Sequence, residues 1–595
     1  MKSFYFLLLS MAYSSLQAQT NYVVNMANAS SPGQNNTLIG PRAGTAITSG
    51  SQNSFVGVDA GANNTIGVNN SFVGISAGSN NNVGSYNNFI GSFAGAGNTT
   101  GNFNVFLGSN AGYRNTTGDN NSFVGYGSGY SNTVGTQNSF VGFQTGFGNT
   151  TGGGNSFLGF YAGRGNTTGQ NNSFVGAYAG ASNNNGSFNS FVGHNAGYRN
   201  ADGNNNSFIG TQAGYSNTTG SNNSFLGYSA GYNNTTGSSN TFVGTYAGAI
   251  NSTGNYNSFV GYGAGNNNAS GSQNSFMGYN VGSLNTTGSA NSFVGYYAGL
   301  NNTTGSNNTF MGTGAGLSNS AGMYNSYSGS GAGYNNQTGS QNTIAGYQAG
   351  YNLTSSANTL VGYNAGYNTT SGANNTFFGF QAGYNVTTGS NNIIVGPMSG
   401  TAITDGSDNV LMGYNSQAED GLHNATAIGA ESRVAVSNAL ILGNGANVGI
   451  GTSAPATRLE VVSPQADQSG LRLTSLTTNS PSVLATDQFL TVNPQGDVVK
   501  ARYQLRISDV SQWSDKVFSP TYQLRPLSQV ASYVREQGHL PGVPSAEQVK
   551  KEGVDLVKMN SLLLEKVEEL TLYSISQQER IDKLERMLVE LLQKK

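Results

Sequence analysis

The chain has 595 residues, a net charge of −2, only 8% charged residues and no cysteine. This length exceeds one compact domain. The absence of cysteine excludes disulfides, thiol catalysis, cysteine-ligated zinc and a lipid anchor on cysteine, and the near-zero charge does not favour nucleic acid or an anionic membrane as a partner. Aromatic residues make up 10% of the chain, more than is typical of disordered sequences. We therefore expect an ordered repeat protein.

The first 18 residues have the pattern of a signal peptide. Lys2 supplies a positive charge, residues 4–9 are apolar, and Leu16-Gln17-Ala18 is a suitable cleavage site. The alternative is a buried first strand. Beyond this segment no stretch has the ~20 apolar residues that a membrane helix needs. The sequence predicts an exported chain with no membrane span after cleavage and a short N-terminal segment over 19–32.

Residues 33–416 repeat with a period of 17. The unit from 53 to 69 reads NSFVGVDAGANNTIGVN, and its phenylalanine column runs through 23 positions from Leu38 to Leu411 with one 16-residue step. Phenylalanine fills 17 of these positions, and the glycine two places further on is present in all 23. The predicted structural core of the repeat is illustrated by three units: Phe55, Val56, Gly57, Phe72, Val73, Gly74, Phe123, Val124 and Gly125.

A regular period of this length predicts one coil of a long parallel β-solenoid, or β-roll, in an all-β fold. We expect NSFVGY to form a first strand, an Ala-Gly pair to form a turn, and Asn-Thr-Thr to form a second strand. Coils spaced ~4.8 Å apart would give a rod of about 110 Å for the 23 repeats. Stacked asparagines are expected to form hydrogen-bonded ladders.

The valine column next to the phenylalanine column predicts a second buried face. Phe55 and Val56 are neighbours in a strand, so their side chains point to opposite faces. One face fills the coil interior, and the other forms an apolar stripe of a kind that soluble monomers rarely expose. We expect other copies of the chain to cover the stripe. The alternative is a flattened coil that buries both columns internally.

The segments that follow resemble parts of known fibres. Residues 417–454 contain glycines 14 apart, Gly429 and Gly443, and resemble the head repeats of trimeric autotransporter adhesins, as the 17-residue units do more loosely. Residues 455–503 resemble a β segment of phage tail fibres. Residues 504–555 resemble chaperone domains of tail fibres and the terminal region of exported fibre proteins of the Bacteroidetes. These resemblances imply a homotrimer in the extracellular space or on the outer surface of a Gram-negative bacterium.

The last segment, 556–595, has the heptad pattern of a C-terminal α-helical coiled coil. Ser574 and Gln577 interrupt the apolar seam, and Arg580 with Glu585 fits a motif that favours three strands. The alternative is a surface helix that packs on its own chain. The residues predicted to trimerise are Val567, Leu570, Arg580, Ile581, Leu584, Glu585, Leu588 and Leu591.

The sequence shows no catalytic, cofactor-binding or metal-binding site. The acids of the repeat region are scattered, which argues against calcium loops and glycosidase chemistry. We therefore predict a non-enzymatic adhesin or structural filament of unknown ligand, with no cofactor. One alternative is an ice-binding solenoid, although alternate residues of an extended Asn-Thr-Thr strand would not give a double rank of threonine. The other alternative is a tail-fibre-like protein that cleaves itself at Ser514, next to Asp515. The sequence offers no suitable partner lysine for this reaction.

Overall fold

The structure is a computed structural model that describes residues 33–465, 468, 470–474, 479–480, 488–502 and 509–594. The predicted signal peptide and the segment 19–32 lie outside these residues. The chain divides into two compact units, of which the first ends at Gly470 and the second begins at Leu471.

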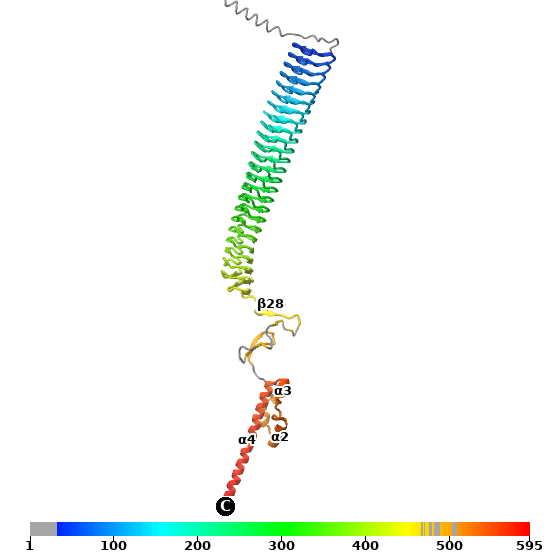
Figure 1. Ribbon diagram of the computed structural model, residues 1–595. Coiled ribbons are helices and arrows are strands. Elements are labelled where there is room, and N and C mark those ends of the chain that lie inside the picture. The colour runs from blue at the N-terminus through cyan, green and yellow to red at the C-terminus, as the bar shows by residue number, and fades with distance from the viewer. Residues whose placement is uncertain are drawn as a thin grey trace, which may run out of the picture. The chain divides into compact units, whose positions relative to one another are not determined.

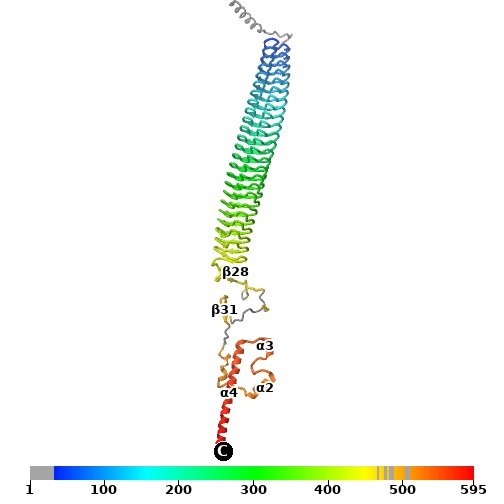
Figure 2. The same cartoon turned by 60° about the vertical axis from the view of Figure 1, so that its left-hand side comes forward.

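The first unit is a long parallel β-solenoid, as the sequence predicts (Figures 1 and 2). Each coil contributes one short strand to a 25-stranded sheet, and each strand pairs in parallel register with that of the next coil, so that Phe55 lies opposite Phe72. The strands of this sheet are β1 (Thr37–Ile39), β2 (Ser54–Val56), β3 (Ser71–Val73), β4 (Asn88–Ile90), β5 (Val105–Leu107), β6 (Ser122–Val124), β7 (Ser139–Val141), β8 (Ser156–Leu158), β9 (Ser173–Val175), β10 (Ser190–Val192), β11 (Ser207–Ile209), β12 (Ser224–Leu226), β13 (Thr241–Val243), β14 (Ser258–Val260), β15 (Ser275–Met277), β16 (Ser292–Val294), β17 (Thr309–Met311), β18 (Ser326–Ser328), β19 (Thr343–Ala345), β20 (Thr359–Val361), β21 (Thr376–Phe378), β22 (Ile393–Val395), β23 (Val410–Met412), β25 (Thr426–Ile428) and β27 (Leu440–Leu442).

The 14-residue repeats continue the same sheet. β25 pairs with β27 so that Thr426 lies opposite Leu440, 14 residues later. A second small sheet forms beside it from β24 (Gln417–Ala418) and β26 (Arg433–Val434). After the solenoid, β28 (Val448–Ile450) pairs in parallel with β29 (Leu459–Val461).

The second strand expected in each 17-residue coil is absent. The Asn-Thr-Thr segments, such as 149–151, form bends instead of strands. The cause is visible at Asn149, whose side-chain Nδ2 turns inward and donates to the carbonyl of Gly152 at 3.0 Å. This bond curls the chain, and it leaves both Thr150 and Thr151 with exposed surface, contrary to the alternation expected of a strand. Backbone bonds to the next coil persist, as from Thr150 N–H to the carbonyl of Thr167 at 2.9 Å.

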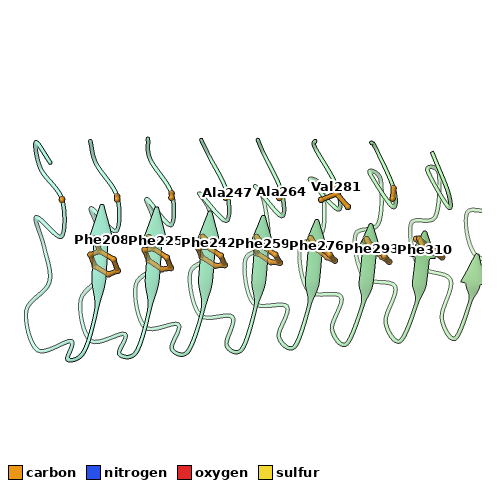
Figure 3. Packing of buried hydrophobic residues seen from close by; sticks show 14 of the residues in the cluster. Phe208, Phe225, Phe242, Ala247, Phe259, Ala264, Phe276, Val281, Phe293 and Phe310 are labelled. Atoms are coloured by element: carbon orange, nitrogen blue, oxygen red, sulfur yellow. The ribbon is translucent and has the colours of Figure 1, made fainter. Parts of the chain in front are cut away.

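The core of each coil is an aromatic ring packed against alanine. Phe55 and Phe72 are fully buried, and their rings stack with centroids 4.8 Å apart and planes 4° apart. This distance matches the spacing of hydrogen-bonded strands. Figure 3 shows the same column farther along, with Ala247 and Ala264 facing the rings. Each buried phenylalanine contributes about 1.5–3 kcal/mol relative to an exposed one.

Two asparagine columns inside the coils confirm the predicted ladders. In the first column, the backbone N–H of Asn70 donates to Oδ1 of Asn53 at 3.0 Å, and Nδ2 of Asn70 donates to the carbonyl of Gly84 at 2.9 Å. In the second column, Nδ2 of Asn81 donates to Oδ1 of Asn64 at 2.7 Å and to the same Gly84 carbonyl at 2.8 Å. The ladders therefore satisfy buried polar groups that would otherwise cost stability.

The second glycine of the unit is required by two effects. Gly61 has a φ of 58°, and a Cβ there would lie 2.5 Å from the ring of Phe55. The first glycine of the unit, Gly57, has a φ of 138°, and its Cβ would lie 2.4 Å from the carbonyl oxygen of Gly74. A Cβ cannot be accommodated at these distances, which explains why both columns consist of glycine along the rod.

The second unit contains a hairpin and a group of helices. β30 (Gln488–Val492) and β31 (Val498–Arg502) are antiparallel, and in the turn between them Gly496 N–H donates to the carbonyl of Asn493 at 2.9 Å. Two 3-10 helices follow, η2 (Val510–Gln512) and η3 (Ser514–Phe518), and then the α-helices α2 (Leu527–Gln537), α3 (Ala546–Glu552) and α4 (Leu556–Gln593). No helix within the described part of the chain is both long and apolar enough to cross a bilayer.

Candidate interaction surfaces

The outer face of the solenoid sheet carries a long apolar stripe that is interrupted at Ser328. We call this the valine stripe: it comprises the third residue of each solenoid strand. Phe55 points inward with no exposed area, whereas Val73, Ile90 and Met311 on the opposite face are 37%, 43% and 53% exposed. The flattened coil that would bury both columns is therefore wrong for the single chain.

Aromatic side chains form further columns on the turn that follows each strand. Tyr113, Tyr130 and Phe147 stack with centroids 5.0 and 4.8 Å apart. Tyr262, Tyr279 and Tyr296 form another stack, four residues earlier in the repeat unit, with spacings of 5.2 and 5.3 Å. These columns were missed by sequence reasoning, although the tyrosine that often follows the Ala-Gly pair is a usable signal.

Three arginines of the rod, Arg114, Arg164 and Arg199, lie over aromatic rings. The guanidinium carbon of Arg164 is 4.8 Å from the ring centroid of Tyr161, and that of Arg199 is 5.5 Å from the ring of Tyr215. Such contacts contribute about 0.5–1 kcal/mol at exposed sites. The charge is thus held against the surface of the rod.

One face of α4 packs on the segment 510–525 of its own chain. Ser514 is buried and its Oγ donates to Oε1 of Glu568 at 3.1 Å. Ser561 Oγ donates to the carbonyl of Gln512 at 2.5 Å, and Tyr573 OH donates to the carbonyl of Arg525 at 2.5 Å. The alternative of a helix that packs on its own chain is therefore correct for this half of α4.

The opposite face of α4 carries the predicted seam, and it is exposed. The buried contacts use heptad positions b and g, since Ser561 and Glu568 are at b and Tyr573 is at g. The seam positions a and d remain open in the single chain, so the structure shows a long helix and not a coiled coil. Arg580 and Glu585 are also exposed. The exposed seam residues are Leu563 (49%), Val567 (56%), Leu570 (62%), Ile581 (47%), Leu584 (60%), Leu588 (58%) and Leu591 (67%).

A charged cluster surrounds the docked half of α4. Lys516 Nζ lies 2.9 Å from Oε2 of Glu565, and Lys566 Nζ lies 3.3 Å from Oε1 of the same residue. Burial raises the pKa of Glu565, but the hydrogen bonds and charges of Lys516 and Lys566 outweigh it and hold the pKa below its ordinary value. Burial and the bond to Glu569 raise the pKa of Tyr522, which therefore stays protonated as a donor.

Ser514, the residue named in the self-cleavage alternative, is held in contacts with α4. The Ser514 hydroxyl is bonded to a carboxylate, and Lys516, two residues away, is paired with Glu565. Among the described residues no group of three or more His, Asp or Glu side chains is placed to hold a metal ion. The structure brings the predicted core residues Phe72, Phe123 and Val124 into the columns described above.

No protein-family model matches the sequence, and the search of curated proteins finds no relative. The interpretation of function therefore rests on the geometry of the solenoid and of α4.

Proposed function

We propose that the chain is an exported homotrimeric fibre that acts as an adhesin or structural filament through its repetitive surface. The observation that supports this most is that two apolar surfaces, the valine stripe and the α4 seam, are exposed and are covered by none of the residues that the structure describes. Each of these surfaces requires a long, linear, apolar partner. A second copy of the chain offers such a partner to both surfaces, so their presence in one molecule favours self-association.

A second copy of the chain fits the valine stripe best. Adjacent residues of the stripe repeat at the strand spacing, and another copy presents the same spacing, so side chains can interlock along the whole length. The repeat region carries few charges, so copies do not repel one another. Exposed apolar patches of this extent are characteristic of interaction sites in soluble proteins.

The seam of α4 supports the same stoichiometry. The intramolecular contacts of Ser561 and Glu568 occupy position b and leave a and d free for other helices. Arg580 at g can bridge to Glu585 at e of a neighbouring copy. Export rests on the predicted signal peptide, and the adhesin role rests on the resemblance of the repeats to adhesin heads.

The test is the molar mass of the purified protein by light scattering. We expect residues 19–595 to be a trimer. Residues 19–555, which lack α4, should form a weaker trimer that dissociates at a higher protein concentration, because only the valine stripe remains. A monodisperse monomer in both cases would overturn the proposal.

Ice binding is the second candidate, because Thr150 and Thr151 both reach the surface instead of alternating. The Thr150 hydroxyl, however, already donates to the carbonyl of Thr167 at 2.9 Å. Clear thermal hysteresis in a solution of the rod would put this function ahead of adhesion.

A further inference from the structure

The aromatic columns of the rod give way to small residues at several places, one of which lies directly after Tyr296. Tyr296 ends the stack that contains Tyr279, and the next two residues of that column are Thr313 and Ser330. The column beside it changes from Tyr297 to glycine in the same two coils. The result is an open notch of about 290 Å³ on the turn side of the rod.

The walls of the notch are aromatic and its polar groups are neutral. Tyr296 forms one end, Tyr334 and Leu317 line a side, and Gln348 lies at the other end. Gly314 forms part of the floor, where a Cβ would lie 3.3 Å from the ring of Tyr334. No charged side chain lines this notch.

The changes at these positions are not explained by the interior of the rod. The interior also changes nearby, because buried Tyr327 accepts a bond from Asn336, and Leu353 replaces asparagine in the next coil. Thr313 and Ser330, however, lie on the outer turn, and an aromatic residue occupies their position in the coils before and after them. Their small size therefore affects only the outer surface.

We propose that this notch binds a neutral saccharide as the ligand of the adhesin, an inference that rests on the proposed adhesin function. The apolar C–H face of a sugar ring packs on the electron-rich face of an aromatic ring. Tyr296 is the last ring of its stack, and the ring of Tyr297 lies tilted beside it with centroids 4.1 Å apart, so two aromatic rings are present at this end of the notch. Hydroxyls of Thr313 and Ser330 and the Gln348 amide match the hydroxyls of a sugar, which both donate and accept.

The size of the notch fits a short oligosaccharide. Three coil steps of ~4.8 Å separate the coil of Tyr296 from that of Gln348, a span of about 14 Å. Part of this span is occupied by the end residues themselves. The remaining length suits two sugar units, whereas a folded protein partner would need a much larger surface.

The test uses the repeat itself as a guide to tolerated substitutions. Thr313→Tyr with Ser330→Tyr restores the aromatic residue that neighbouring coils carry and fills the notch. Thr211→Tyr with Thr245→Tyr makes equivalent changes at the same column position elsewhere on the rod. The full chain and both variants are applied to an array of neutral oligosaccharides, and the best binder is titrated by calorimetry.

We expect the filled variant to lose affinity at least tenfold and the control variant to keep it. Binding that survives filling, or a wild-type chain that binds no neutral oligosaccharide, would overturn the saccharide site. Molar mass is measured on the same samples. A trimer without saccharide binding contradicts the notch alone, whereas a monomer contradicts the proposed fibre.

Discussion

Asn302 and Asn319 are joined by a buried hydrogen bond of 2.7 Å from Nδ2 of Asn319 to Oδ1 of Asn302, across two coils of the rod. Nδ2 of Asn302 in turn donates to Asn285 at 2.7 Å and to the carbonyl of Gly305 at 3.0 Å. A single amide thus connects three coils. The buried asparagines of the repeat therefore connect the coils inside the rod.

Replacing Asn302 by alanine should destabilise its coil strongly. The change leaves polar groups of Asn285 and Asn319 buried with fewer partners, which costs about 1–3 kcal/mol. Asn301→Ala, one residue earlier and partly exposed, is the control and should cost little. Amide hydrogen exchange over residues 291–322 is the suitable measurement because repeat proteins open locally. Equal protection in the two variants would contradict the role of the ladder.

Two glycines of one coil should differ in their tolerance of alanine. A Cβ at Gly129 would lie 2.5 Å from the ring of Phe123, whereas the nearest atom to a Cβ at Gly127 is 3.4 Å away. Both have positive φ, but non-glycine residues such as Asn110 occupy the position of Gly127 in other coils. We expect Gly129→Ala to cost ~3 kcal/mol by overpacking and Gly127→Ala about 1 kcal/mol. Denaturation midpoints of the two variants test this order.

The docking of residues 510–525 on α4 should weaken in acid. Because the pKa of Glu565 is lowered in the folded state, its contribution is complete above the ordinary glutamate pKa of about 4.3 and is lost as the pH falls through the lowered value. Trp513 is the single tryptophan of the chain and lies between η2 and η3, so its fluorescence reports the docking. Glu565→Gln should flatten the acid transition. If the acid transition were unchanged in this variant, other carboxylates would be responsible for the transition.

Ser514→Ala should affect stability and not chain length. The variant removes the donor to buried Glu568, with a cost of about 1–3 kcal/mol. Ser519→Ala, at an exposed position, is the control. Denaturing gels should show full-length chains for the wild type and both variants. If only chains with Ser514 intact were shortened, self-cleavage would be established and the non-enzymatic proposal would be wrong.

Charges introduced on the two faces of α4 should have different effects on assembly. Leu584→Glu with Leu588→Glu places charges in the proposed seam and should abolish or weaken the trimer. Ile575 and Val589 are exposed to a similar degree but lie at position b, so Ile575→Glu with Val589→Glu should leave the molar mass unchanged. Equal effects of the two pairs, measured by light scattering, would argue against a seam at a and d.

The repeat could be interpreted from sequence because it is periodic. The period of 17, the phenylalanine column and the invariant glycines predict a parallel solenoid, since only stacked coils bring equivalent residues together at every step. The predicted second strand was wrong. Local preference for extended structure at Asn-Thr-Thr is overcome by the inward side chain of Asn149, whose bond to Gly152 bends the chain.

The sequence by itself determined the coil period, the inward phenylalanines and the heptad pattern of the last helix, because each is a regular spacing that one chain reveals. Only the tertiary structure decided which surfaces remain open. It placed Ser514 against Glu568 over a separation of 54 residues, and it left the seam and the valine stripe exposed. Such contacts depend on where distant segments meet in space, and no local spacing in the chain encodes them.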